Sequence, residues 1–302
     1  MDCMLSKIKI KTALLYLTVF FYSTLSFANP AYYFRNMAVE DGLSQNMVYS
    51  ILQDNTGFIW FGTLDGLNRY DGLKYKIFKK ENQNDQSIGS NKIFSLLQNS
   101  DDKIWIGTAN GIYIYDPLYE SFSHFNLSTV NGEKVEGAVR DLKADKEGNI
   151  WMGVQGKGVF CFKKDDKLIF YSLKNTNVRK IDFDVHGNVW VATHGRGLLK
   201  MNPVSSQVKE FLIDTKKQKV SENDINTILS FNSNYLLLGT VNKGVQKFDL
   251  LTEKFTPFLE KGEAGNPLYV RCMIKTENQG IWIGTEEGVY IYDSTFASKL
   301  IC

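Results

Sequence analysis

Residues 93–108 read IFSLLQNSDDKIWIGT, and the same pattern occurs five more times in the 302-residue chain. The other copies are VYSILQDNTGFIWFGT from Val48, VRDLKADKEGNIWMGV from Val139, VRKIDFDVHGNVWVAT from Val178, INTILSFNSNYLLLGT from Ile225 and VRCMIKTENQGIWIGT from Val270. Their starts are separated by 45, 46, 39, 47 and 45 residues. A period of this length indicates one supersecondary unit that is repeated.

Each copy predicts two strands joined by a turn. The turn holds residue types that tolerate positive φ, such as Gly57 and Asp102. The second strand, such as residues 104–106, is apolar on both faces, so we expect both faces to be covered. A third strand such as residues 112–115 and an aromatic fourth strand such as residues 75–78 complete the unit. This pattern predicts an all-β fold, a β-propeller of four-stranded blades.

The number of blades is left open at this point. Six repeats are visible, which predicts a six-bladed ring or an incomplete seven-bladed one. The sixth repeat reaches a third strand at residues 289–293 without a clear fourth, whereas residues 32–37 precede the first repeat like an unpaired strand. We expect residues 32–37 to pair with the last blade and close the ring. Because residues 298–302 lack the repeat pattern, we interpret the chain as an N-terminal fragment.

One column of the repeat holds large apolar side chains with apolar neighbours on both sides. Its members are Trp60, Trp105, Trp151, Trp190, Leu237 and Trp282. We expect these side chains to fill the space between adjacent blades, in preference to forming a surface platform on which sugars stack.

The N-terminus has the order of a secretory signal. Three lysines (Lys7, Lys9 and Lys11) precede an apolar run, residues 13–27, and a small-x-small site ends at Ala28. We expect cleavage after Ala28, which leaves residues 29–302 as a periplasmic propeller domain. An uncleaved N-terminal anchor is the alternative interpretation.

Charge and cysteine content exclude several classes. Without residues 1–28 the chain has 32 basic and 32 acidic residues, so it lacks the basic excess that nucleic-acid binding requires. Three cysteines follow Ala28, an odd number with wide spacing, which predicts neither a disulfide framework nor a metal site. Cys161 lies in an apolar stretch and is expected to be a buried thiol. We expect no cofactor and no metal.

Two further columns are candidate ligand contacts. The loops after the Trp-x-Gly-Thr strands emerge on one rim of a propeller, and their polar side chains include Asp65, Asn110, Lys157, His194, Arg196, Asn242 and Glu286. The second position of each block lies on the innermost strand and holds Tyr49, Phe94, Arg140, Arg179, Asn226 and Arg271. Arginine forks suit carboxylates and sulfates, and aromatic faces suit sugar rings. We therefore predict an axial pocket, formed by Tyr49, Phe94 and the three arginines, for an acidic group of a uronate or a sulfated sugar. The alternatives are rim loops that are polar only because they are solvated, and arginines that extend outward to water.

The first unit resembles a known family. Residues 41–44 (DGLS), 54–57 (DNTG), 60–63 (WFGT) and 65–72 (DGLNRYDG) are similar to the opening blade of the two-component regulator propeller. The resemblance covers residues 32–296. It implies the periplasmic sensor region of a hybrid two-component system of the Bacteroidota type, many members of which detect glycans.

The sequence also departs from that family. Its members usually join two seven-bladed propellers to a β-sandwich, a membrane helix, a histidine kinase and a response regulator, and this sequence shows six repeats and none of the rest. The resemblance therefore implies a non-catalytic module that recognises an oligosaccharide or another small ligand. It also implies that the signal passes to kinase domains absent from this chain, with a second propeller or a homodimer partner in the intact protein. Membrane attachment is expected only through the signal peptide or missing downstream segments.

Two other classes remain open. One is a secreted propeller enzyme of the polysaccharide lyase or glycosidase kind, and the other is a stand-alone propeller that binds carbohydrate or protein. For catalysis, His194 is the one imidazole expected on the rim, and no carboxylate is in register with it.

Overall fold

The computed structural model describes residues 34–129, 131–173, 175–213, 223–263, 265–276, 280–292 and 298–300. The expected signal peptide, residues 1–28, and Cys302 lie outside the described residues. Residues 38–302 form one compact unit, and residues 34–37 belong to a separate N-terminal unit. A short 3-10 helix, η1 (Val39–Asp41), precedes the first sheet.

The strands form six four-stranded antiparallel sheets, or blades, each consecutive in sequence. Blades 1 and 2 contain β1 (Val48–Gln53), β2 (Ile59–Thr63), β3 (Gly66–Tyr70), β4 (Tyr75–Phe78), β5 (Ile93–Gln98), β6 (Ile104–Thr108), β7 (Gly111–Asp116) and β8 (Ser121–Phe125). Blades 3 and 4 contain β9 (Val139–Ala144), β10 (Ile150–Val154), β11 (Gly158–Phe162), β12 (Leu168–Ser172), β13 (Asn177–Phe183), β14 (Val189–His194), β15 (Leu198–Met201) and β16 (Val208–Phe211). Blades 5 and 6 contain β17 (Ile225–Ser230), β18 (Tyr235–Thr240), β19 (Val245–Asp249), β20 (Phe255–Leu259), β21 (Val270–Lys275), β22 (Ile281–Thr285), β23 (Val289–Tyr292) and β24 (Ser298–Leu300).

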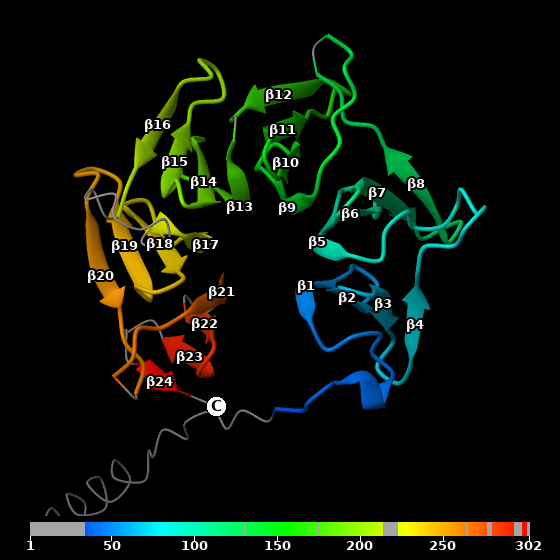
Figure 1. The fold of residues 1–302 in the computed structure, drawn as a ribbon, viewed down its shortest axis with the longest axis horizontal. Coiled ribbons are helices and arrows are strands. Elements are labelled where there is room, and N and C mark those ends of the chain that lie inside the picture. Colours follow the sequence, from blue (N-terminus) through cyan, green and yellow to red (C-terminus); the bar gives the residue numbers. More distant parts are fainter. Residues whose placement is uncertain are drawn as a thin grey trace, which may run out of the picture. The chain divides into compact units, whose positions relative to one another are not determined.

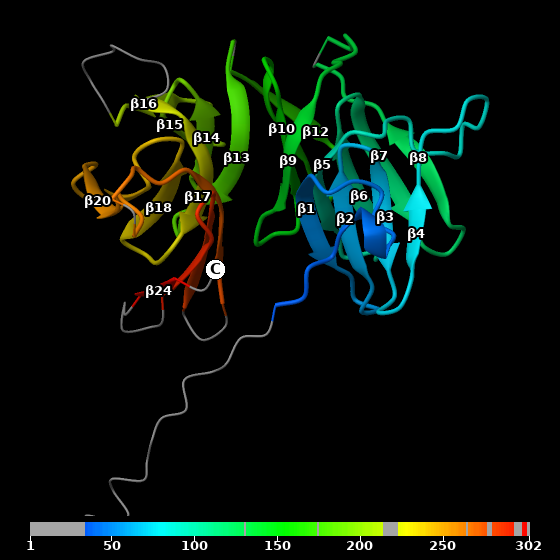
Figure 2. The same ribbon diagram turned by 60° about the horizontal axis from the view of Figure 1, so that its bottom comes forward.

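The blades follow one another around a common axis (Figure 1). The first strand of each blade is innermost, and these strands contact one another in the order β1, β5, β9, β13, β17 and β21. Figure 2 shows β1, β5 and β9 side by side along the inner wall. The predicted fold class is confirmed, and the structure has six blades.

The tryptophan column lies between blades. Trp60, Trp105, Trp151 and Trp190 are at most 3 % exposed, and Trp282 is half-buried. Trp105 of β6 packs in one cluster with Ile150 and Met152 of the next blade. Each of these four buried indoles therefore belongs to a separate apolar cluster that joins two adjacent blades.

Three of these indoles also form a hydrogen bond that stabilises the turn between the first and second strands of their blade. Trp60 donates its Nε1–H to Oδ2 of Asp54 at 2.7 Å, and Trp151 and Trp190 make the same bond to Asp145 and Asp184. Blade 2 has Asn99 at that position, and the buried Nε1 of Trp105 has no hydrogen-bond partner in the described part of the chain.

The glycine of Trp-x-Gly-Thr is required by close packing. A Cβ on Gly107 would lie 2.8 Å from the carbonyl oxygen of Val139, the first residue of β9, and would also overlap the hydroxyl of Ser95. A side chain at Gly107 would push blade 3 away from blade 2, so this glycine sets the spacing of these two blades.

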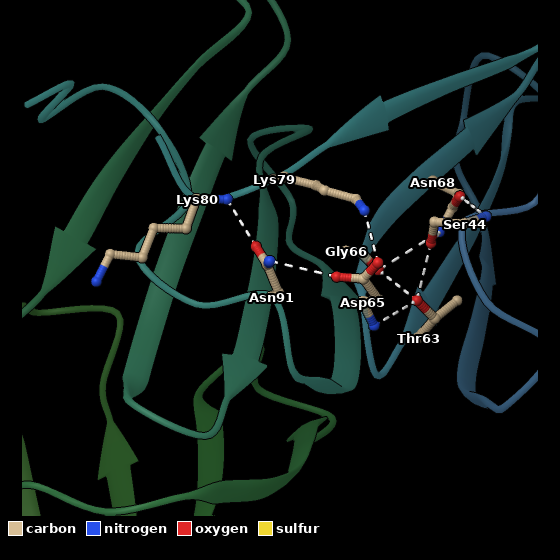
Figure 3. Close-up of polar contacts among 8 residues, drawn as sticks. All are labelled: Ser44, Thr63, Asp65, Gly66, Asn68, Lys79, Lys80 and Asn91. Carbon is tan, nitrogen blue, oxygen red and sulfur yellow. Dashed lines mark hydrogen bonds and ion pairs between the residues drawn. The ribbon is translucent and has the colours of Figure 1, made fainter. Parts of the chain in front are cut away.

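Ser44, at the end of the segment formed by residues 41–44, is hydrogen-bonded to blade 1 at its rim (Figure 3). Ser44 donates its backbone N–H to Oδ1 of Asn68 at 2.9 Å, and its Oγ lies 3.0 Å from Oγ1 of Thr63. Asn68 is fully buried and donates Nδ2–H back to Oγ of Ser44 at 2.8 Å. These bonds hold residues 41–44 against the upper end of blade 1.

The expected closure by residues 32–37 is wrong. Residues 34–37 form no strand, residues 32 and 33 lie outside the described residues, and the fourth strand of blade 6 is β24. β24 pairs with β23 through Tyr290↔Leu300, Ile291↔Lys299 and Tyr292↔Ser298. Ladder bonds use backbone N–H and C=O groups, so residues 298–300 pair although their side chains lack the repeat pattern.

Candidate functional site

The axial column is produced by a β-bulge that recurs in all six blades. In blade 1, Val48 and Ser50 of β1 pair with the adjacent residues Thr63 and Gly62 of β2, which leaves Tyr49 as the extra residue. The register shifts at the equivalent point in the other five blades. The bulged residues are Tyr49, Phe94, Arg140, Arg179, Asn226 and Arg271. A bulge re-aims the side chain of its extra residue, so each innermost strand presents one side chain outside the regular pleat.

Four of these residues form what we call the axial cluster: Tyr49, Phe94, Arg140 and Arg179. The rings of Tyr49 and Phe94 meet edge to face with centroids 5.4 Å apart. Cζ of Arg140 lies 4.0 Å from the centroid of the Phe94 ring, a cation–π contact. Aromatic and cationic side chains from blades 1, 2 and 3 therefore contact one another directly.

Burial and a second positive charge both act on the guanidinium group of Arg140 in this cluster. Burial lowers the pKa of Arg140, and the positive charge of Arg179 lowers it further, while Tyr49 acts in the opposite direction. The Nε–H of Arg140 is donated to the neutral Oε1 of Gln155 at 2.9 Å. Arg179 makes no hydrogen bond or ion pair with any described residue. The two guanidinium groups, on adjacent innermost strands, thus repel each other, and neither has a carboxylate partner within the described part of the chain.

The third arginine of the predicted pocket has other partners. Arg271 donates to Oε1 of Glu286 at 2.7 Å, and its Cζ lies 4.4 Å from the ring centroid of Tyr269. Its side chain is 60 % exposed. The bulged residue of blade 5, Asn226, donates Nδ2–H to the carbonyl of Val270.

Two contacts place the axial and rim columns at the same end of the propeller. Arg140 of β9 reaches Gln155 in the loop after β10, and Arg271 of β21 reaches Glu286 in the loop after β22. The bulges and the rim loops therefore border one surface, although the sequence suggests two separate columns.

Most rim side chains are engaged with the protein itself. Asp65 accepts from Lys79 Nζ at 2.6 Å and from Asn91 Nδ2 at 3.3 Å, and Asn91 also accepts the backbone N–H of Lys80 (Figure 3). Arg196 bonds Glu210 at 2.7 Å and the hydroxyl of Thr176. Lys157 and Asn110 are exposed, and Asn242 is half-buried.

His194 has a partner that the sequence does not suggest. Its Nδ1 lies 2.7 Å from Oδ2 of Asp224, which is 6 % exposed, while the buried Oδ1 of Asp224 has no partner among the described residues. The expectation that no carboxylate accompanies His194 is wrong. Asp224 stands one residue before the fifth block, outside the aligned columns, so the repeat alignment gave no signal for it.

The described residues contain no group of three or more His, Cys, Asp or Glu side chains able to hold a metal ion. Within the same residues, no helix has the length and apolar character needed to cross a bilayer.

Comparison with known proteins finds family similarity in two segments of this propeller. Residues 42–65 and 87–110 match the two component regulator propeller family. Over 65 residues the chain is 40 % identical to histidine kinase P4 of Formosa agariphila, an alignment that covers 22 % of this chain and 5 % of that protein.

Solved structures share the fold. The extracellular domain of a hybrid two-component system from B. thetaiotaomicron superposes with a TM-score of 0.75 at 24 % identity, over 88 % of this chain and 36 % of that domain. Virginiamycin B lyase from Staphylococcus aureus superposes with a TM-score of 0.64 at 14 % identity, over 84 % of each chain.

The six four-stranded sheets and their bulged innermost strands define a six-bladed β-propeller. Two segments of the chain match the two component regulator propeller family, and its fold is similar to that of an extracellular domain of a hybrid two-component system. The chain spans about a third of the length of the extracellular domain it matches and a twentieth of the kinase.

Proposed function

We propose that this chain is an exported, non-catalytic sensor propeller of a two-component signalling protein, and that its axial cluster binds an acidic group of an oligosaccharide. In this proposal residues 1–28 direct export and are removed after Ala28, and residues 29–302 act in the periplasm. Ligand binding biases the orientation of this propeller relative to a second propeller or protomer, and thereby a histidine kinase.

The observation that carries the proposed binding site is the pair of guanidinium groups in the axial cluster. Arg140 loses hydration by burial and lies near Arg179, which makes no polar contact with the described residues. A carboxylate or sulfate between them would offset their repulsion and accept several charge-assisted hydrogen bonds. The rings of Tyr49 and Phe94 supply a face on which a sugar ring packs.

Calorimetric titration tests this site. The probes are an oligogalacturonate, which carries carboxylates and no sulfate, and a carrageenan oligosaccharide, which carries sulfate esters and no carboxylate, so the two anion chemistries are tested separately. We expect Arg179→Ala and Arg140→Ala each to weaken binding by about tenfold or more, with an affinity that falls as salt is raised. Lys167→Ala removes one exposed positive charge elsewhere and is the matched control. Equal affinity in the arginine variants and the control, or no binding of either acidic probe, would refute the acidic-ligand site.

Polysaccharide cleavage is the second candidate function, because His194 and Asp224 form a histidine–carboxylate pair on the rim. We favour sensing, because the matched family and the sensor domain with the higher TM-score both belong to signalling proteins. Incubation with a polysaccharide panel should yield no new reducing ends and no unsaturated products. Products that disappear in a His194→Ala protein would establish an enzyme instead.

A further inference from the structure

A cavity of about 530 Å³ lies on blade 2, and none of its lining residues belongs to the axial cluster. Its lining comes from the turn between β6 and β7, from the outer strands β7 and β8, and from the connection to blade 3. The volume falls within the range of pockets that hold small organic ligands.

The connection between blades 2 and 3 is shaped as a small hairpin that walls this cavity. Ser128 and Lys134 form an antiparallel bridge. Val135 donates its N–H to the carbonyl of Leu127 at 2.8 Å, and both residues line the cavity. These backbone bonds fix the wall without occupying the polar side chains that face the cavity.

The floor of the cavity is aromatic. The rings of Tyr113 and His124 meet edge to face with centroids 5.1 Å apart, and Phe125 lies beside them with its ring against Trp105. Nδ1 of His124 is engaged with Oδ1 of Asn126 at 3.0 Å, which fixes the orientation of the imidazole.

Three polar groups of the lining have no hydrogen-bond partner within the described residues. They are the carboxamide of Asn110, the hydroxyl of Tyr113 and Nε2 of His124. The two charged side chains of the lining form an ion pair, with Nζ of Lys134 3.1 Å from Oε1 of Glu136. The cavity thus offers hydrogen-bonding groups and aromatic surface, with charges that cancel.

Equivalent positions in other blades do not repeat this chemistry. In blade 3 the pair that corresponds to Tyr113 and His124 is Phe160 and Phe170, which stack at 4.4 Å as part of the core. In blade 1 the pair is Asn68 and Ile77. The polar and aromatic combination is therefore a property of blade 2 and does not follow from the repeat.

We infer that this blade 2 cavity is a separate binding site for a neutral, polyhydroxylated ring, namely an uncharged sugar residue. The apolar face of the ring packs on His124 and Tyr113, and its hydroxyls exchange hydrogen bonds with Asn110 and Nε2 of His124. The charges of Lys134 and Glu136 are opposite and equal, so the lining has no net charge to attract an ionic ligand, which distinguishes this cavity from the axial cluster.

Ligand-detected NMR on the full exported protein tests the inference. The probes are neutral trisaccharides with different linkages (maltotriose, cellotriose, xylotriose and mannotriose) at up to about 10 mM, a concentration that detects weak binding. We expect saturation transfer to at least one of them, and about fivefold or greater weakening in both His124→Ala and Asn110→Ala. Ile77→Ala changes the position equivalent to His124 in blade 1 and should leave binding unchanged.

Two results would overturn the inference: no neutral trisaccharide binds, or binding persists unchanged in both cavity variants. Thermal unfolding separates loss of the site from loss of the fold, and Asn110→Ala, at an exposed side chain, is the variant expected to unfold as wild type does. Titration with oligogalacturonate should be unaffected by His124→Ala, so failure of this site and failure of the axial site are distinguishable.

Discussion

Lys180 of β13 places its Nζ 2.8 Å from Oδ1 of Asp141 on β9, which joins the innermost strands of blades 3 and 4. Asp141 is 3 % exposed, and its Oδ2 also accepts the backbone N–H of Ile181 at 2.8 Å. A second pair runs in the opposite direction, from Lys143 of β9 to Asp182 of β13, also at 2.8 Å. Two crossed ion pairs therefore fix this junction beside the axial cluster.

We expect Asp141→Asn to lower the free energy of unfolding by about 1.5–3 kcal/mol, because the buried carboxylate loses its charge-assisted hydrogen bonds with the partly exposed Lys180 ammonium and the Ile181 N–H. Urea denaturation followed by tryptophan fluorescence measures the change. Asp165→Asn breaks the exposed pair with Lys167 and should have no measurable effect. Equal effects of the two substitutions would contradict a special role for the junction.

The same pair predicts a pH dependence. The Asp141 carboxylate raises the pKa of Lys180 above its ordinary value of 10.5, although burial acts in the opposite direction. A raised folded-state pKa contributes stability that is fully present below pH 10.5 and is lost as the pH rises through the folded pKa. Wild type should therefore lose stability in this alkaline range more steeply than Asp141→Asn. Parallel curves for the two proteins would contradict the coupling.

Asn99→Asp should stabilise blade 2. Oδ1 of Asn99 accepts the backbone N–H groups of Asp101 and Lys103. Oδ1 of Asp54 accepts the two equivalent N–H groups in the turn of blade 1. The second polar side-chain atom of Asn99 is the donor Nδ2, whereas that of Asp54 is an acceptor oxygen. A carboxylate would give the buried Nε1 of Trp105 the acceptor it lacks. We expect a gain of at most about 1 kcal/mol in the free energy of unfolding, because the change also replaces the Nδ2–H hydrogen bond to Asp101 with two facing carboxylates.

The reverse change, Asp145→Asn, is the control for this exchange. It removes the acceptor of Trp151 in blade 3 and should cost about 1–3 kcal/mol. Burial raises the pKa of Asp145, but hydrogen bonds from Trp151 and Asn149 lower it more, so its contribution is present at neutral pH and is lost as the pH falls through the lowered value. A destabilised Asn99→Asp protein would show that the indole does not require the acceptor.

The repeat made the architecture predictable because each blade must cover a strand that is apolar on both faces. The spacing of the Trp-x-Gly-Thr motif therefore indicated blades, and the position of Trp105 between two of them followed from its apolar neighbours. β24 was missed because main-chain pairing leaves no side-chain pattern.

The candidate site was only partly predictable. The second position of each block was recognisable as a column, but the bulge that re-aims it was not, since an extra residue has no compositional mark. Arg271 contacts Glu286 and Tyr269, which become its neighbours only in the folded blade. Asp224 reaches His194 from the next blade, a contact that no spacing within one repeat encodes.

Gly107→Ala should loosen the junction of blades 2 and 3. The added Cβ would lie 2.8 Å from the Val139 carbonyl, so the backbone of β9 must shift, at a cost of about 1–3 kcal/mol in the free energy of unfolding. The double variant Gly107→Ala with Ser95→Ala removes only the overlap between the added Cβ and the Ser95 hydroxyl. It should therefore recover part of the lost free energy of unfolding. Blade 4 already has Ala192 at this position, so Ala192→Gly is the control and should change stability little. Full recovery in the double variant would show that the backbone contact is not limiting.

Cys161 and Cys272 should differ in reactivity. Cys161 is fully buried in β11, and burial raises the pKa of its thiol to about 12, whereas Cys272 of β21 is exposed. The thiolate is the reactive form, so at pH 8 the Cys161 thiol is almost entirely protonated as well as shielded. Peptide mapping after treatment of the native protein with N-ethylmaleimide should find Cys272 modified and Cys161 unmodified. In urea both should react, which confirms that the fold protects Cys161, and Cys272→Ser identifies the reactive position. Labelling of Cys161 in the native protein, at a rate comparable to Cys272, would mean that blade 3 opens far more readily than its packing indicates.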